Sequence, residues 1–346
     1  MAKLGVAVIG AGMLGRRHAE NLRSKIAGAQ LVAVCDASLQ RAKEVAAELE
    51  VECATDRIEE ILGRKDVQAV AIATPSKFHA GQTEASAQAG KHVFCEKPMA
   101  LTLADADAAL AAVRRAGVEL QIGFMRRYDP GYAAAKERIE AGEIGDPVIF
   151  KSVGRDRQPP PVSFFEGGVN GSLFSDSAIH DFDLARWMMR DEVATVHTFA
   201  GLLACPELAR FGDVDATLVN LRFTRGGIGN VESYRKSSYG YDIRTEVLGT
   251  KGAVHVGYLQ HTPFQVLTQS GIRHDVVDHW LARFADAYLA EVRDFVHSVQ
   301  SGAPVKVGGE DGRRALAAAL AAEQSYHQSL PVTLAPDASF AGGHSA

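Results

Sequence analysis

The stretch LGVAVIGAGMLG, residues 4–15, decides the fold class of this chain. Residues 4–9 form a short, continuous apolar run, which is typical of a strand buried on both faces of a parallel sheet. Gly10, Gly12 and Gly15 follow with the spacing GxGxxG, and a helix-like stretch comes next. Glycines at these positions permit a tight turn, close approach of the backbone to a pyrophosphate, and close packing of helix on strand. The start of that helix then offers free N–H groups to phosphate.

Asp36 ends a second apolar run, residues 31–35, about 20 residues after the loop, where an acidic residue accepts hydrogen bonds from a ribose diol. A carboxylate there also repels the 2′-phosphate of NADP, and Ala37 and Ser38 follow it rather than an arginine. We therefore predict NAD as the cofactor. The competing interpretation, glycines in a plain turn and a solvated Asp36, is disfavoured because strand, loop, helix and acid occur in the required order. The predicted cofactor contacts are Gly10, Gly12, Met13, Leu14, Gly15, Asp36, Thr74, Pro75, His79, Glu96 and Lys97.

The composition is that of an ordinary globular protein: 346 residues, 47% hydrophobic and 23% charged, with a formal net charge of -5. This charge balance gives no reason to expect nucleic acid or an anionic membrane as a partner. The four cysteines include no Cys-x-x-Cys pair and indicate buried thiols in a reducing compartment. No apolar run approaches the ~18 residues of a spanning helix. We expect a cytoplasmic protein.

Two patterns divide the chain. In the first third, apolar runs at 67–73 and 92–95 alternate with helix-like stretches such as 38–49, which predicts a Rossmann-type, doubly wound parallel sheet over residues 1–124. Farther on, longer runs separated by Gly-rich turns predict antiparallel strands at 147–153, 194–202, 216–223, 229–234, 245–249 and 252–256. Helices are expected at 176–189 and 279–298. We predict an α+β domain over 125–335 for substrate binding and oligomerisation, followed by a tail, 336–346.

Lys97 lies in the step Glu96-Lys97-Pro98, just past an apolar strand. The carboxyl ends of such strands are where open α/β sheets bind ligands. Pro98 keeps Lys97 out of helical geometry and indicates a special turn. A lysine there can hydrogen-bond to a substrate hydroxyl and stabilise a developing alkoxide. The alternative is a surface lysine in a turn.

Asp176 and His180 are four residues apart in a predicted helix, so they would share one face. Histidine suits proton transfer near neutral pH, and a nearby carboxylate sets its tautomer and basicity. Asp183 would face the same site or close the cluster. A plain surface pair and a metal cluster are the alternatives. We expect no metal, because nothing else in the sequence supplies a convincing further set of ligands.

These motifs together resemble the glucose–fructose oxidoreductase/inositol dehydrogenase/rhizopine catabolism (Gfo/Idh/MocA) family over about residues 3–330. The stretches GFMRRYDP (123–130), SAIHDFD (177–183), YGYDI (239–243) and DHWLARF (278–284) are similar to its inositol 2-dehydrogenase members. The resemblance implies NAD-dependent oxidation of a cyclic polyol, first of all myo-inositol to its 2-keto product, scyllo-inosose.

The resemblance also implies residue roles. His180 would accept the hydroxyl proton, Lys97 would polarise that hydroxyl, and Asp176 would orient the polar network. The implied substrate contacts are Lys97, Met125, Arg126, Arg127, Asp156, Asp176, His180, Tyr239 and Trp280. Relatives of this kind are commonly tetramers, so a homotetramer is expected.

One departure from the family concerns the substrate. Where inositol dehydrogenases carry a His-Arg-Asn-like step, this chain has Gly-Arg-Asp-Arg at 154–157, followed by a loop over 158–171 that we expect to overhang the substrate. Three alternatives therefore stay open: a dehydrogenase of another inositol isomer or a pyranoside, an enzyme that recycles tightly held NAD, and a non-catalytic NAD-binding regulator.

Overall fold

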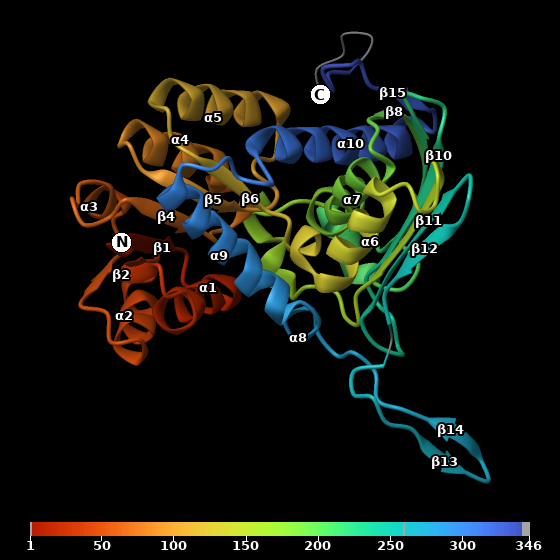
Figure 1. Ribbon diagram of the computed structural model, residues 1–346, viewed down its shortest axis with the longest axis horizontal. Coiled ribbons are helices and arrows are strands. Elements are labelled where there is room, and N and C mark those ends of the chain that lie inside the picture. The colour runs from red at the N-terminus through yellow and green to blue at the C-terminus, as the bar shows by residue number, and fades with distance from the viewer. Residues whose placement is uncertain (1, 259, 341–346) are drawn as a thin grey trace. The chain divides into compact units, whose positions relative to one another are not determined.

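The structure, a computed structural model, describes residues 2–258 and 260–340 (Figure 1). Its contacts define two compact units. Unit 1 contains the chain up to Met125, together with Gly168–Asn170 and Asp286–Leu316. Unit 2 contains Arg126–Gly167, Gly171–Ala285 and the chain from Ala317 onward. The chain passes from unit 1 to unit 2 after Met125, returns to unit 1 at Asp286 and leaves it again after Leu316.

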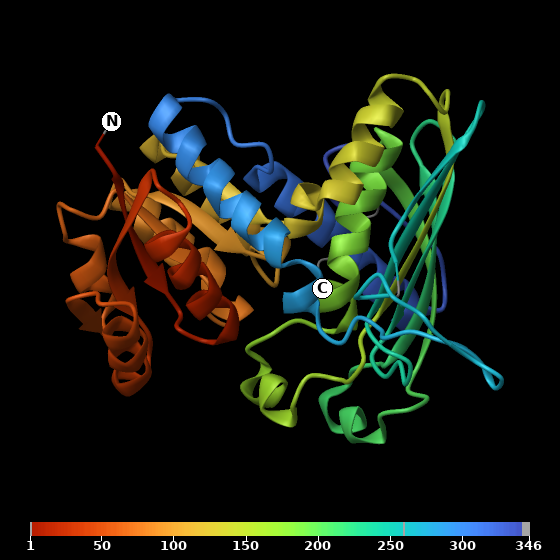
Figure 2. The ribbon, with the colours of Figure 1, turned by 60° about the horizontal axis from the view of Figure 1, so that its bottom comes forward.

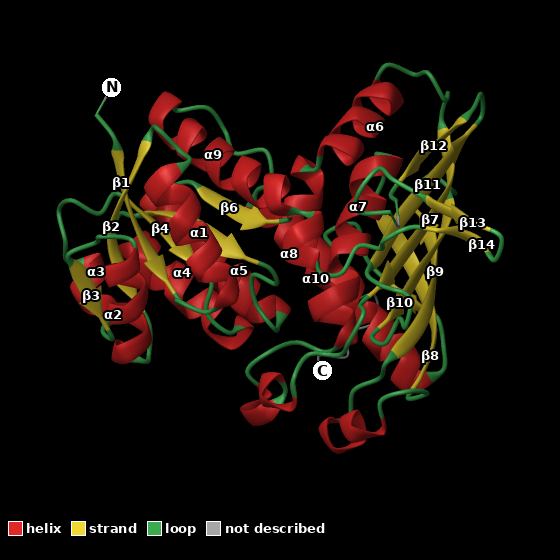
Figure 3. Cartoon of the chain, turned by 90° about the horizontal axis from the view of Figure 1, so that it is seen from below, coloured by secondary structure: helices red, strands yellow, loops and turns green. Residues whose placement is uncertain are grey.

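Unit 1 contains a parallel sheet of six strands in the order β3-β2-β1-β4-β5-β6. β1 and β4 are buried along their whole length because helices cover both faces of the sheet (Figure 3). This confirms the predicted Rossmann fold. The strands are β1 (Leu4–Ile9), β2 (Ala29–Cys35), β3 (Cys53–Thr55), β4 (Ala69–Ile72), β5 (His92–Glu96) and β6 (Leu120–Gly123).

The helices of unit 1 come from both ends of the chain. Val292, Phe295 and Val296 of α9 enter the same apolar core as residues of β1 and β2. Ser38 and Thr102 begin α2 and α5 by accepting a backbone N–H bond, as N-cap residues do. The helices are α1 (Met13–Ser24), α2 (Leu39–Glu48), α3 (Ile58–Leu62), α4 (His79–Gln88), α5 (Leu103–Ala116), α9 (Ala285–Ser301) and the first part of α10 (Gly309–Gln328).

Unit 2 contains a sheet of seven strands in the order β12-β11-β7-β10-β9-β8-β15. β7 and β10 pair in parallel and the other neighbours are antiparallel, so the sheet is mainly antiparallel, as predicted. Side chains along β9 alternate between buried and exposed, because only one face of the sheet is covered. The strands are β7 (Pro147–Arg155), β8 (Val193–Gly201), β9 (Ala216–Phe223), β10 (Ile228–Tyr234), β11 (Asp242–Gly249), β12 (Ala253–Val256) and β15 (Val332–Thr333).

Helices α6 (Pro130–Glu140) and α7 (Ile179–Met189) lie along one face of this sheet (Figure 2). The remaining helical segments of unit 2 are a π-helix (Phe174–Ala178), α8 (Trp280–Arg283) and the later part of α10. A hairpin of β13 (Val266–Thr268) and β14 (Gly271–Arg273) stands apart from the sheet (Figure 1). Short 3₁₀ turns cover Ser76–Phe78, Met125–Tyr128, Val162–Phe164, Glu166–Gly168 and Pro206–Phe211.

Three further observations concern the sequence-based expectations. The helix expected at 279–298 is two helices, α8 and α9, which separate at Phe284. Within the predicted tail, Phe340 forms a bridge with Leu334, and residues 341–346 lie outside the described residues. None of the helices that the structure describes is long and apolar enough to cross a membrane.

Candidate active site

The three glycines after β1 have different surroundings. Gly10 has a φ of +95°, and a Cβ there would lie 2.5 Å from the carbonyl oxygen of Ala73. A Cβ on Gly15 would lie 1.7 Å from the carbonyl oxygen of Gly10, so α1 packs directly on the loop. A Cβ on Gly12 would meet no atom of the described residues within 4 Å. The open space at Gly12 is where a pyrophosphate approaches the backbone of such a loop.

Helix α1 begins at this loop with Gly12 as its N-cap residue. Within the described part of the chain, no side chain caps it. Its first N–H groups and the positive end of its dipole therefore suit a phosphate. Met13 is 62% exposed beside them, and Leu14 is half-buried. The loop fits the pyrophosphate of NAD.

Asp36 is fixed at the end of β2 by the loop itself. Its Oδ2 accepts a hydrogen bond from the Ala11 amide (2.7 Å), and its Oδ1 accepts one from the Ser38 amide (2.8 Å). Arg41 of α2 places Nη1 3.3 Å from Oδ1, a contact that the sequence did not reveal. The two residues that follow Asp36 in the sequence carry no positive charge. Arg41, in the first turn of α2, nevertheless places its guanidinium group beside the Asp36 carboxylate.

The turn after β4 holds three of the predicted cofactor residues, Thr74, Pro75 and His79. The Thr74 hydroxyl donates to Gln82 Oε1 (2.7 Å). The buried His79 ring lies 2.7 Å from the carbonyl oxygen of Pro98 through Nδ1 and 2.7 Å from that of Thr74 through Nε2. Burial lowers the pKa of His79, although both carbonyl contacts oppose this shift. His79 therefore links two loops, and its nitrogens are engaged within the protein.

Part of the 158–171 loop packs in unit 1, against this same turn. The Lys77 amide donates to the carbonyl oxygen of Val169 (2.9 Å), and the Ser76 amide donates to Asn170 Oδ1 (3.3 Å). The sequence suggested that this loop overhangs the substrate. The structure shows that residues 168–170 contact the cofactor-binding unit.

Lys97 follows the last residue of β5, at the carboxyl end of the sheet, and is half-buried. The Lys97–Pro98 peptide bond is cis, which is the special turn that Pro98 indicated. The backbone amide of Lys97 donates to Glu96 Oε2 (3.3 Å). Glu96 is buried, and its other oxygen lies 2.7 Å from His18 Nε2. The buried Glu96 carboxylate thus holds the backbone of the Lys97–Pro98 turn by a hydrogen bond.

Asp176 and His180 lie in unit 2, on either side of a change in helix type. Asp176 belongs to the π-helix and is half-buried, whereas His180 is buried in the first turn of α7. The single α-helix expected over 176–189 is therefore corrected to a π-helix followed by an α-helix. Short π segments occur often at functional sites, because they re-aim side chains that a regular helix would direct elsewhere.

Arg235 lies behind Asp176, a residue that the sequence analysis missed. It is fully buried, and its Nη2 lies 3.9 Å from Asp176 Oδ2 and 3.2 Å from Asp213 Oδ2. Its guanidinium group lies over the Phe165 ring, 5.2 Å from the ring centre. Arg235 belongs to none of the recognised motifs, and its ionic partners, Asp176 and Asp213, are distant from it in the sequence.

Asp156 lies at the end of β7 and accepts a hydrogen bond from Ser177 Oγ (3.2 Å), next to Asp176 in the sequence. Burial raises the pKa of Asp156 to about 6; the charge of Asp176 adds to the rise and Arg235 opposes it. This predicted substrate contact therefore exchanges its proton close to neutral pH and belongs to the same polar cluster as Asp176.

Both arginines predicted to bind substrate form internal ion pairs in unit 2. Arg126 Nη1 contacts Asp181 Oδ1 at 2.6 Å, and both side chains are buried. Arg127 donates through Nε (2.8 Å) and Nη2 (2.5 Å) to the two oxygens of Asp183. Asp183 thus holds Arg127. These contacts give the arginines a structural role at this site, fixing α7 against the turn before α6.

The remaining predicted substrate residues differ in exposure. The Tyr239 side chain is exposed, and its hydroxyl donates to Asp242 Oδ2 (2.7 Å) and accepts from Arg155. Trp280 is the half-buried first residue of α8. Met125 is buried in unit 1. The structure therefore brings together Asp156 and Asp176 in unit 2, and the glycine loop, Asp36 and Lys97 along one edge of the sheet in unit 1.

The chemistry of each set is distinct. Unit 1 offers amides and a dipole for phosphate, a carboxylate for a ribose diol, and the Lys97 ammonium. Unit 2 offers the imidazole of His180, which can accept a proton, together with carboxyl groups and a phenol that hydrogen-bond to hydroxyls.

Similarity to known proteins extends over nearly the whole chain. Residues 4–124 match the family described as "Oxidoreductase family, NAD-binding Rossmann fold", and residues 136–334 match "Oxidoreductase family, C-terminal alpha/beta domain". The chain is 39% identical to the scyllo-inositol 2-dehydrogenase (NAD(+)) of Bacillus subtilis, covering 95% of each protein. It is 38% identical to the myo-inositol 2-dehydrogenase of Thermotoga maritima, covering 95% of this chain and 98% of that one.

A solved structure shares the same architecture. The scyllo-inositol dehydrogenase of Lactobacillus casei, with bound NAD(H) and scyllo-inositol, superposes with a TM-score of 0.90 at 30% identity. The match covers 96% of this chain and 99% of that one. Both sequence and fold place this chain in the Gfo/Idh/MocA family of NAD-binding oxidoreductases, to which it belongs.

Proposed function

We propose that this protein oxidises one ring hydroxyl of an inositol, with myo-inositol and scyllo-inositol as the first candidates, to the corresponding ketone. The observation that carries the proposal is the likeness, at 38–39% identity over 95% of the chain, to dehydrogenases of these two isomers. NAD would be held by the amides of the glycine loop and by Asp36. When bound, it supplies the acceptor for the hydride that leaves the substrate carbon.

Each catalytic residue has a role that follows from its chemistry. His180 would accept the proton of the reacting hydroxyl as a general base. Lys97 would donate a hydrogen bond to the same oxygen and stabilise the negative charge that develops there. Asp176 would orient the polar network around His180, with the buried Arg235 behind it. Asp156, Tyr239 and Trp280 would contact the ring, since carboxyl and phenol groups bind hydroxyls and an indole covers C–H faces.

The test is an absorbance assay for NADH with a panel of cyclitols and pyranosides. We expect turnover of an inositol with NAD. Because general-base catalysis contributes about 10²- to 10⁴-fold, His180→Ala should lower kcat by roughly that factor, and Lys97→Ala should be similarly impaired. His255→Ala, which alters an exposed histidine of β12, is the matched control.

The outcomes separate the alternatives. Turnover of a pyranoside but of no cyclitol would reject the inositol assignment and keep the dehydrogenase. Full activity in the Lys97 and His180 variants would reject the assigned roles. NAD that stays bound through purification, with no NADH released on adding substrate, would favour a recycling enzyme.

We also propose a homo-oligomer, as predicted, in the reducing cytoplasm. The outer face of the unit 2 sheet supports the first part, because Phe199 of β8 and Leu218 of β9 are direct neighbours there and both are exposed. Apolar side chains gathered on one face often mark contacts between subunits. The four free cysteines are consistent with the second part.

A further inference from the structure

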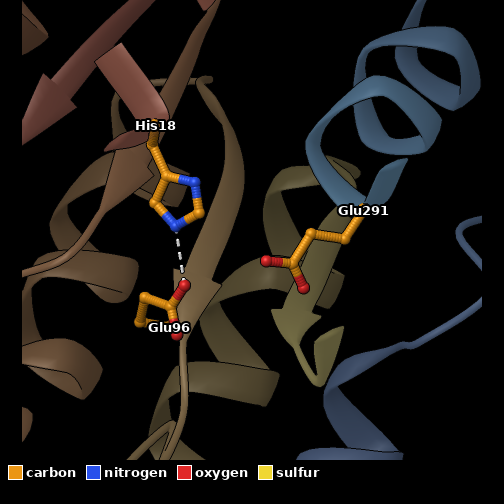
Figure 4. A group of neighbouring side chains, drawn as sticks. All are labelled: His18, Glu96 and Glu291. Atoms are coloured by element: carbon orange, nitrogen blue, oxygen red, sulfur yellow. Dashed lines mark hydrogen bonds and ion pairs between the residues drawn. The ribbon is translucent and has the colours of Figure 1, made fainter. Parts of the chain in front are cut away.

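Three ionisable side chains lie close together in the interior of unit 1 (Figure 4). His18 comes from α1, Glu96 from the end of β5 and Glu291 from α9. One nitrogen or oxygen atom of each lies within 4.8 Å of the others. All three residues are buried. The proposed mechanism uses none of these side chains directly.

The Glu96 carboxyl is fixed on several sides. Its Oε1 lies 2.7 Å from His18 Nε2, which acts as the donor when that nitrogen carries the proton. Its Oε2 accepts from the backbone amide of Lys97 at 3.3 Å. A Cβ on Gly123 would lie 2.9–3.0 Å from its carboxyl atoms, so the carboxyl of Glu96 packs directly against the backbone of β6. Glu96 therefore determines where the chain enters the Lys97 turn.

Glu291 is the residue that requires an explanation. Its side chain is 0% exposed, and neither carboxyl oxygen has a hydrogen-bond partner among the described residues. Its backbone carbonyl accepts from Gln121 Nε2 (2.8 Å), which fixes α9 at this point. A buried, ionised carboxylate without a partner costs far more free energy than a neutral one. Burial, and then the nearby Glu96 charge, raise the pKa of Glu291 well above its usual range.

Two aromatic rings and a neutral thiol pack around the cluster. The rings of Phe94 and Tyr288 pack edge-on against His18, at 5.2 Å and 6.1 Å between ring centres. Burial raises the pKa of Cys95, next to Glu96, to about 12, so that the thiol stays protonated. Two carboxyl groups this close in an apolar interior share a proton more readily than both ionise.

We propose that Glu291 is a positioning residue for Lys97: as a neutral acid it directs its proton to the Glu96 carboxylate, which, with His18, fixes the backbone of the Lys97 turn. The proton of Glu291 completes the set of donors around Glu96, after the imidazole N–H of His18 and the amide of Lys97. The cluster thereby joins the helix of the phosphate loop to the turn that carries the catalytic lysine. The link to catalysis rests on the role proposed for Lys97.

The proton on Glu291 can be observed without turnover. A protonated carboxyl has a carbonyl stretching band in the infrared, distinct from that of carboxylates. We expect the band in the wild-type protein at pH 8, where Asp156 is ionised, and a loss of intensity in Glu291→Gln, whereas Glu44→Gln, on the exposed surface of α2, should retain it. Absence of the band from the wild type overturns the proposal. So does a stoichiometric divalent metal in the purified protein, which would mean that a cation balances the two carboxylates.

The positioning role is tested by kinetics. Glu291→Met is similar in size but cannot donate a hydrogen bond, and we expect kcat to fall roughly 10- to 100-fold, the effect of misplacing a catalytic group by about 1 Å. NAD affinity should change much less. Glu291→Gln, a neutral donor, should recover most of kcat. Equal losses in both variants, or no loss in either, would overturn the role. If Glu291→Met fails to fold, the Gln variant and the infrared band still decide.

Failure of this inference and failure of the proposed function are distinguishable. The infrared measurement concerns the protein alone, whereas the inositol assay concerns its substrate. A band with no inositol turnover would reject the substrate and keep the buried acid. Inositol turnover without an infrared band would keep the substrate assignment and reject the protonated Glu291.

Discussion

Asp36 and Arg41 set the charge where the adenosine ribose is expected to bind. The carboxylate is buried and accepts two backbone amides, whereas the arginine beside it is about half exposed. Asp36 therefore offers a hydrogen-bond acceptor to the ribose, and the positive charge of Arg41 lies next to it. A 2′-phosphate would meet the repulsion of Asp36 before it could benefit from Arg41.

Asp36→Asn removes that repulsion while keeping an acceptor for the loop. We expect the ratio of kcat/KM for NADP to that for NAD to rise by about tenfold or more, since a change of about 1.4 kcal/mol in relative binding suffices for that factor. The double variant Asp36→Asn/Arg41→Ala should lose this gain, because Arg41 would provide the new contact to phosphate. Identical ratios in the single and double variants would show that Arg41 takes no part. Steady-state kinetics with both cofactors provides the measurement.

Asp129 determines how α6 begins. Its Oδ1 accepts from the amides of Gly131 (3.1 Å) and Tyr132 (3.3 Å), and its Oδ2 pairs with Arg283 Nη1 at 2.6 Å. Both members of the pair are buried. One carboxyl therefore caps α6 and neutralises a cation from α8.

Asp129→Ala should lower the free energy of unfolding by about 3–5 kcal/mol, because it leaves a buried arginine without its partner as well as removing the cap. Thr102→Ala, which removes only the exposed cap of α5, should cost about 1 kcal/mol. Asp129→Asn, which can still cap the helix, should fall between them. Urea denaturation of the three variants measures these losses. Equal values for Asp129→Ala and Thr102→Ala would show that the ion pair adds nothing.

At the scale of elements, strands and helices marked by a local sequence pattern were predictable. Contacts between residues that are far apart in the sequence were not. The predicted strands 4–9 and 216–223 match β1 and β9 residue for residue. A continuous apolar run indicates a strand buried on both faces, and alternating apolar and polar residues indicate a strand buried on one face. The π-helix at Asp176 was missed, since its hydrogen-bond spacing leaves no trace in hydrophobic periodicity. Helix α10 was missed too, because its alanine-rich middle is buried on all sides and shows no polar face. The place of Glu291 beside Glu96 depends on α9 returning to unit 1, which no local pattern encodes.

At the scale of the whole molecule, the uncovered face of the unit 2 sheet favours self-association. Phe199 is 64% exposed and Leu218 47% exposed, side by side on neighbouring strands. We expect light scattering to show an oligomer, a tetramer in the first instance, and Phe199→Glu to shift it toward smaller species, since charge in an apolar interface is costly. Leu267→Glu, in the β13–β14 hairpin, is the matched control. Dissociation by the hairpin variant alone would place the contact there instead.

The grouping of residues 286–316 with the N-terminal Rossmann unit bears on how the protein matures during synthesis. When the ribosome has produced the first 125 residues, the sheet can pair, but α9 has not yet been made. The apolar core that it completes and the buried side chains of His18 and Glu96 would stay open to water until the last part of the chain emerges. The nucleotide-binding unit begins first but is complete only after residue 316 has been made, so its completion is a late event in folding. A nascent chain stopped before residue 286 should therefore remain sensitive to protease in the region that the full-length protein protects.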